Sequence, residues 1–130
     1  MMLREQAKVL FGKAREDITV LRELLANTKV SDDIWGFHAQ QAVEKLLKTQ
    51  LAVRGIAFPF THRLNDLADL LDDNHQALDP EFESLLELTG YAVELRYIRL
   101  DTGTTTPLDR DAIFAQVGRL EELTASQIRF

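Results

Sequence analysis

Apolar residues along most of this chain recur every three to four positions, which is the spacing of one face of an α-helix. No segment of useful length alternates with the period of two that strands require. An all-α fold follows from these two observations. The clearest stripe lies in residues 3–27 and consists of Leu3, Ala7, Leu10, Phe11, Ala14, Ile18, Leu21, Leu24 and Leu25.

Start and stop signals divide the rest of the chain into four further helices. The second helix runs from the capping residue Ser31 to about Arg54, and Gly55 supplies the left-handed conformation that closes a helix. A shorter third helix follows, with Thr61 as its expected cap. Its apolar positions are Leu64, Leu67, Ala68 and Leu71.

The last two helices begin at Asp79-Pro80, a capping acid before a first-turn proline, and at Leu108. We expect the fourth to end near Ile98 and the fifth near Ile128. Pro59 disfavours helix, so residues 56–61 are expected to turn over the end of the bundle. The prediction is one domain, residues 1–130, folded as an up-and-down helical bundle of four long helices plus one short helix that covers an end.

Composition excludes several classes of function. With 15 Lys plus Arg against 21 Asp plus Glu, the net charge of −6 opposes nucleic-acid binding over the whole surface, although a local basic cleft is not excluded. The chain has no cysteine, which excludes disulfides and thiolate chemistry. No apolar run reaches about 18 residues and the start is charged, so we expect a cytoplasmic protein that does not span a membrane.

Four polar residues share one side of the second helix, namely His38, Gln41, Lys45 and Lys48. For such a stripe alone, an ordinary solvated face is the favoured interpretation. Arg96 is more unusual, because the helical spacing of the fourth helix places it on the same face as apolar residues. A buried guanidinium needs an anionic partner, such as Asp17 or a ligand, unless it only bonds the last carbonyls of its helix.

The pair His62 and Arg63 stands at the start of the third helix, where basic side chains and exposed amides could hold a phosphate. Ordinary surface residues are the alternative there. His75 has no second ligand at metal-binding spacing, so we expect no metal site and no cofactor. Glycine-rich phosphate loops, nucleophile elbows and HExxH motifs are absent from the sequence.

Three motifs in order along the chain resemble the HEPN family of prokaryotic helical domains. They are Phe37-His38-Ala39-Gln40-Gln41-Ala42-Val43-Glu44-Lys45-Leu46-Leu47-Lys48, His62-Arg63-Leu64 and Leu95-Arg96-Tyr97. The resemblance spans nearly the whole chain, and its most specific part is the Gln-Gln-Ala-x-Glu-Lys core. It implies a homodimeric bundle, often encoded beside a minimal nucleotidyltransferase, with roles in nucleotide binding, toxin–antitoxin pairs or RNA cleavage.

In catalytic members of the family, the Arg at the end of the fourth helix is followed by a His after four to six intervening residues. No His follows Arg96 at that spacing, so the ribonuclease motif is incomplete and we assign no catalytic residue. The resemblance then implies a non-catalytic module that binds a nucleotide, RNA or a nucleotidyltransferase partner. Its expected nucleotide-binding residues are His38, Gln41, Lys45, His62 and Arg96.

Two other hypotheses remain open from the sequence. In the first, the chain is a metal-independent HEPN endoribonuclease in which Arg96 stabilises phosphate charge and His62 or His38 replaces the missing base. In the second, it is a structural interaction domain that pairs with other helices through Trp35 and Phe58.

Overall fold

The computed structural model describes residues 2–92 and 107–128, and within these ranges the chain is helical without a strand. The elements, in chain order, are α1 (Met2–Glu23), α2 (Asp32–Val53), α3 (Leu64–Asp73), the 3₁₀-helix η1 (Pro80–Tyr91) and α5 (Arg110–Gln127). The predicted all-α bundle is confirmed. Three of its helices are long α-helices, and the described part of the expected fourth helix is a 3₁₀-helix.

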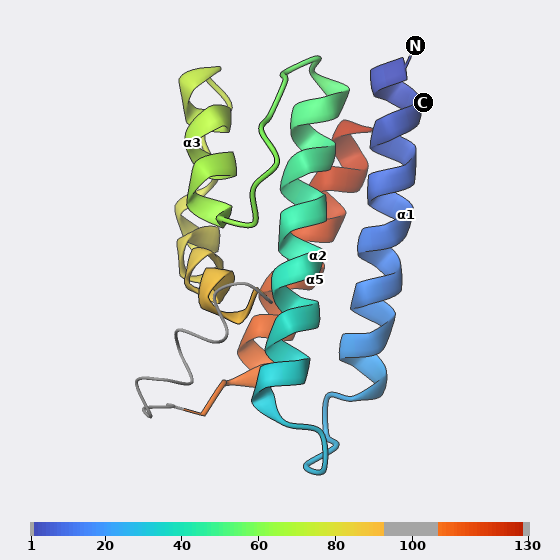
Figure 1. The fold of residues 1–130 in the computed structure, drawn as a ribbon, viewed down its shortest axis with the longest axis vertical. Helices are drawn as coiled ribbons and strands as arrows, with labels where there is room; N and C mark the ends of the chain where they lie inside the picture. The colour runs from blue at the N-terminus through green and yellow to red at the C-terminus, as the bar shows by residue number, and fades with distance from the viewer. Residues whose placement is uncertain (1, 93–106, 129–130) are drawn as a thin grey trace.

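Helix α2 is the centre of the bundle and contacts all four other elements. In Figure 1 it stands between α1 and α3, with α5 behind it. Its neighbours differ in direction: α1 runs antiparallel to α2, whereas α5 runs parallel to it. Residues 54–63 and η1 both run back toward the end where α2 begins, and α5 starts from that end. Bonds at both ends record this parallel pairing, Asp32 to Arg110 at the starts and Gln50 to Thr124 near the ends.

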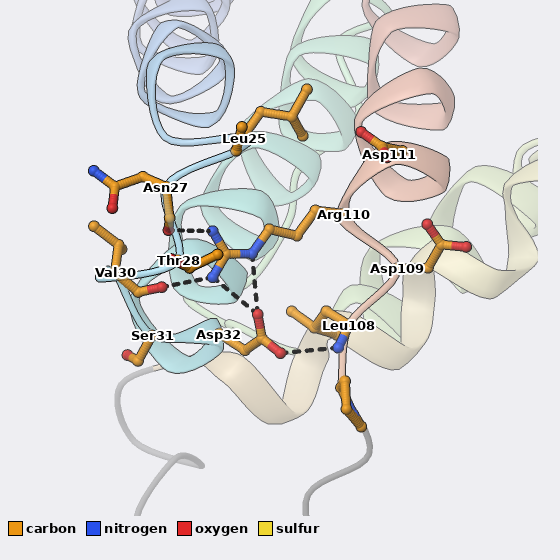
Figure 2. Close-up of a pocket in the computed structure, with 12 residues that line it drawn as sticks. Leu25, Asn27, Thr28, Val30, Ser31, Asp32, Leu108, Asp109, Arg110 and Asp111 are labelled. Atoms are coloured by element: carbon orange, nitrogen blue, oxygen red, sulfur yellow. Dashed lines mark hydrogen bonds and ion pairs between the residues drawn. The ribbon is translucent and has the colours of Figure 1, made fainter.

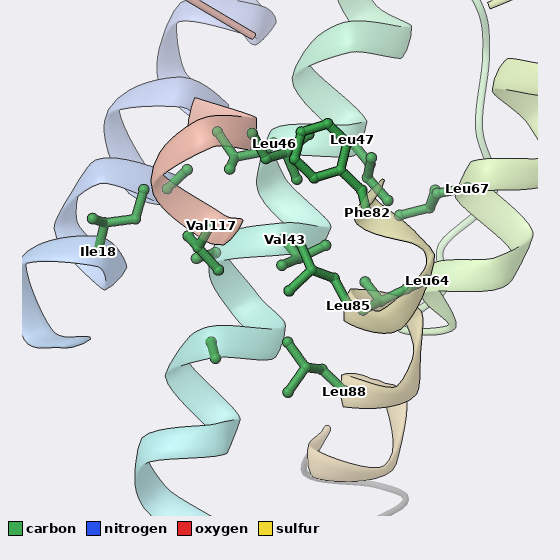
Figure 3. Packing of buried hydrophobic residues seen from close by; sticks show 14 of the residues in the cluster. Ile18, Val43, Leu46, Leu47, Leu64, Leu67, Phe82, Leu85, Leu88 and Val117 are labelled. Carbon is green, nitrogen blue, oxygen red and sulfur yellow. The ribbon is translucent and has the colours of Figure 1, made fainter. Parts of the chain in front are cut away.

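The core forms around α2 and receives side chains from every other element (Figure 3). Removing each Leu, Ile or Phe side chain from water contributes roughly 1.5–3 kcal/mol. The shared packing fixes where α1, α3, η1 and α5 sit around α2. Its labelled members are Ile18, Val43, Leu46, Leu47, Leu64, Leu67, Phe82, Leu85, Leu88 and Val117.

The 3₁₀ geometry of η1 has a visible cause in the sequence. Phe82, Leu85 and Leu88 are separated by three residues each and are all buried. With 3.0 residues per turn, a 3₁₀-helix aligns such residues along one edge, whereas an α-helix would rotate them apart. Leu86, which would share this face in an α-helix, is only partly buried, whereas Leu88 is buried. Residues 93–98 of the predicted helix lie outside the described ranges.

Close approach of η1 to α2 depends on Gly36. A Cβ atom built at Gly36 would stand 2.5 Å from a ring carbon of Tyr91, closer than real contacts allow. Burial, with the charge of Asp32, raises the pKa of the Tyr91 hydroxyl above its ordinary value. Gly36 weakens the first turn of α2, but its missing side chain leaves the space that the Tyr91 ring at the end of η1 occupies.

The connection from α2 to α3 differs from the prediction. After Gly55, whose φ is 73° as a closing residue requires, the chain runs back alongside α2 instead of staying over the bundle end (Figure 1). His62 consequently contacts the middle of α2, where its carbonyl accepts a hydrogen bond from Gln40. α3 packs against the side of α2 and does not cover an end. Within the described ranges, none of the helices is long and apolar enough to cross a membrane.

Candidate functional site

Two hydrogen-bonded clusters of polar side chains lie along the side of α2 that faces α1 and the segment before α3. Together we call them the α2 polar row. Its members come from three parts of the sequence and all are buried or partly buried. They are Asp17, His38, Gln40, Gln41, Glu44, Lys45, Lys48 and His62.

One half of the row is centred on the carboxylate of Asp17, which α1 holds against α2 with 8% of the residue exposed. Its Oδ1 lies 3.0 Å from Nδ1 of His38, and its Oδ2 accepts a bond of 2.6 Å from Nζ of Lys45. An ionised carboxylate only accepts, so His38 donates from Nδ1 and a neutral ring presents Nε2 as an acceptor. Among the described residues, Nε2 of His38 meets no hydrogen-bond partner.

The other half is centred on Glu44, of which 5% is exposed. Its Oε1 accepts bonds from His62 Nδ1 at 2.9 Å and Gln40 Nε2 at 3.0 Å, while Oε2 accepts one from Lys48 Nζ at 3.0 Å. Burial by itself would raise the pKa of Glu44. The bonds from His62, Gln40 and Lys48, with the positive charge of Lys48, outweigh burial and hold that pKa below its ordinary value of 4.5.

Gln41 and Gln40 belong to the half that is centred on Glu44, and among the described residues no hydrogen bond links this half to that of Asp17. Gln41 Nε2 donates a hydrogen bond to Gln40 Oε1 at 2.7 Å. The fully buried Gln40 amide in turn donates one hydrogen bond to Glu44 and another to the carbonyl oxygen of His62. The formal charge balances, because the two carboxylates face two ammonium groups, Lys45 and Lys48. A buried network satisfied in this way rigidifies the helices that contribute to it.

The structure places four of the five predicted binding residues along one side of α2, His38 and Lys45 on the Asp17 carboxylate, and Gln41 and His62 in the cluster around Glu44. The fifth, Arg96, lies outside the described residues. Asp17, predicted as an internal partner of Lys45 or Arg96, pairs with Lys45. The alternative of an ordinary solvated face does not describe this side of α2, because Gln40, Glu44 and Lys48 on it are buried.

Gln40 and Glu44, on which half of the row depends, stood in the motif that carries the resemblance but were not among the predicted binding residues. A signal was present, since Gln40, Glu44 and Lys48 follow at intervals of four on one line of α2.

The phosphate site expected at the start of α3 finds less support in the structure. Its first amides are already engaged, that of Arg63 by the hydroxyl of Thr61 and that of Leu64 by the hydroxyl of Thr89.

A second polar site, also missed, lies where α2 and α5 begin, beside a recess of about 550 Å³ (Figure 2). There Arg110 bonds both the carboxylate of Asp32 and the carbonyl oxygens of Leu24, Asn27 and Val30. Its guanidinium carbon stands 5.6 Å from the ring centre of Trp35. These contacts fasten the α1–α2 turn to α5 and leave Arg110 engaged with protein groups, so we assign this recess a structural role.

Groups of three or more His, Asp or Glu side chains able to hold a metal ion do not occur in residues 2–92 and 107–128. His75, discounted as a ligand from the sequence, adopts a positive φ of 62° in the turn after α3.

Comparison with known proteins shows which family this arrangement of helices belongs to. Neither the curated proteins nor the solved structures contain a match to the chain. The sequence model of the HEPN domain, however, matches residues 7–126, from the first buried turn of α1 to the last turn of α5. That range includes the whole α2 polar row, and the chain therefore belongs to the HEPN domain family.

Proposed function

We propose that this HEPN domain is a non-catalytic module that binds a nucleotide or a short RNA segment along the α2 polar row. One observation carries the proposal: predicted binding residues from separate elements converge and stay accessible. The side chains of His38, Lys45 and His62 keep 28%, 22% and 25% of their surface exposed. A fixed set of partly exposed donors and acceptors is what a polar ligand needs for recognition.

The balanced charge of the row bears on how it would bind. Each ammonium already faces a carboxylate, and the chain carries a net charge of −6, so attraction to phosphate is weak. The base and ribose are then recognised through hydrogen bonds that Gln41 donates and that Nε2 of His38 accepts. We expect an affinity that depends little on salt, unlike binding driven by phosphate contacts.

The proposal extends to partners on the strength of family membership alone. It includes a homodimer that acts in the cytoplasm with a minimal nucleotidyltransferase, in a system of the toxin–antitoxin type. Residues 1–130 would then form one domain of that assembly. Co-purification with a nucleotidyltransferase encoded beside this chain tests the partner independently of the ligand.

A paired substitution, His38→Gln with Gln41→Ala, is expected to weaken nucleotide binding by about 5- to 150-fold, because each of the two lost hydrogen bonds costs roughly 0.5–1.5 kcal/mol. Equilibrium dialysis with AMP and GMP measures the effect. The matched control is Gln6→Ala on the exposed face of α1, which should bind as the unmodified chain does. The proposal is abandoned if no nucleotide binds and the nucleotidyltransferase fails to co-purify.

One observation favours a second candidate, a metal-independent endoribonuclease. Nδ1 of His38 bonds to Asp17, so a carboxylate orients the ring and Nε2 has the position of a general base. In this alternative Arg96 stabilises phosphate charge. RNA cleavage by the purified chain, lost in both Arg96→Ala and His38→Gln, is the expected result. Cleavage that is unchanged in Arg96→Ala removes this candidate.

A further inference from the structure

Phe60 exposes its aromatic ring at the outer edge of the α2 polar row. The residue is 88% exposed, whereas the other exposed large hydrophobic residues of the described chain, Val9, Ile34 and Leu123, are aliphatic and 36–57% exposed. Single exposed apolar residues are ordinary on protein surfaces. What distinguishes Phe60 is its surroundings, because its ring lies among cationic and polar groups.

Two groups of the row touch this ring. The imidazole of His62 meets it edge to face, with 5.3 Å between ring centres and 74° between planes. The ammonium of Lys48 lies 5.9 Å from the centre of the Phe60 ring and 5.8 Å from that of Phe58. The same ammonium donates a hydrogen bond to Glu44, so Lys48 links the Phe60 ring to the buried hydrogen-bond network.

The backbone that carries Phe60 is held on both sides. Phe58 packs against the core, and Pro59 has the fixed φ of its ring. After Phe60, the hydroxyl of Thr61 donates to Asp66 and accepts the amide of Arg63. The segment therefore presents the ring to solvent in a defined position, so little conformational entropy is lost when a ligand covers it.

We propose that Phe60 is a stacking platform for an unpaired nucleobase, with Lys48 over one face of the ring and His62 in an edge-to-face contact beside it; this rests on the proposed binding of a nucleotide by the row. Aromatic side chains that bind single-stranded nucleic acid use their open faces in this way, and every base has a face to offer. A cation beside the stack adds to the attraction. One ring among polar groups is far smaller than the patch of about 800 Å² that a stable protein interface needs from each partner.

Titration of the full chain with AMP, with ribose 5-phosphate and with a single-stranded oligoadenosine tests the assignment. We expect Phe60→Ala to weaken AMP binding by about 10-fold, the effect of removing one stacked base. Phe60→Trp should restore it, and ribose 5-phosphate, which has no base, should bind all three chains equally. An oligoadenosine that binds more tightly than AMP with the same loss in Phe60→Ala identifies single-stranded RNA as the source of the base.

The controls separate this inference from the proposed function. Val9→Ala, at an exposed apolar position on α1, should leave AMP binding unchanged. If the His38→Gln and Gln41→Ala pair weakens AMP binding but Phe60→Ala does not, the platform is wrong and the binding row stands. If the unmodified chain binds neither AMP nor the oligoadenosine, the platform is wrong, and the proposed function falls with it when GMP and the nucleotidyltransferase also fail to bind. A fall in sedimentation mass in Phe60→Ala, with AMP affinity unchanged, identifies a contact between two copies and overturns the platform.

Discussion

Replacement of Arg110 by methionine is expected to lower the free energy of unfolding by roughly 2–4 kcal/mol, somewhat less than the cost of breaking a fully buried ion pair. The Arg110 side chain is 15% exposed, and its removal leaves Asp32 without its charged partner. Three carbonyl oxygens of the α1–α2 turn lose a donor as well. Urea unfolding followed by circular dichroism measures the change.

Arg119→Met is the matched control for this prediction. Arg119 also lies on α5, but its pair with Glu81 spans 3.8 Å and both side chains are about half exposed. Such surface pairs contribute about 0–1 kcal/mol, so the control should unfold close to the unmodified chain. Equal stability of the Arg110 and Arg119 variants would show that the contacts of Arg110 do not fasten the turn.

Helix limits were largely predictable from the sequence because they depend on local chemistry. Ser31 caps α2 by accepting the amide of Ile34, and Gly55 follows the helix with positive φ, as their residue types indicate. Asp79 accepts the amide of Glu81 at the start of η1. In each case the signal and its partner lie within a few residues, so a short window of sequence contains the whole interaction.

Contacts between distant segments were not predictable in the same way. Arg110 and Asp32 are 78 residues apart, and neither a motif nor a helical pattern links them. Glu44 is buried because α2 lies at the centre of the bundle, with a neighbour even on its polar side. Hydrophobic periodicity assumes that each helix has one buried face, an assumption that α1 satisfies and α2 does not.

The candidate site shows an intermediate case. Spacing on α2 correctly grouped His38, Gln41 and Lys45, since residues three or four apart are neighbours on any helix. The approach of His62 required the return of residues 54–63 along α2, which depends on tertiary packing. Local rules thus identified candidates, and only the fold decided which of them share a network.

Glu44→Gln is expected to lower the free energy of unfolding by about 3 kcal/mol near neutral pH, since an isosteric amide removes the charge that faces a buried ammonium. Lys48, whose side chain is 11% exposed, would keep its two phenyl neighbours but no carboxylate. Addition of Lys48→Met to Glu44→Gln should recover most of the loss, because the unpaired charge is then gone. Exposed Glu16 supplies the control, and Glu16→Gln should cost less than about 0.5 kcal/mol.

The same carboxylate should govern part of the stability in acid. Folding lowers the pKa of Glu44 below 4.5, so the folded protein holds fewer protons than the unfolded chain as the pH falls through this range. The stabilisation from Glu44 is therefore complete above about pH 5 and is lost as the pH falls through the folded pKa. Urea unfolding of the unmodified chain and Glu44→Gln from pH 7 to pH 3 should show their stabilities converging at the acid end. A constant difference across that range would contradict the charged contact between Glu44 and Lys48, because protonation would then leave the pair unaffected.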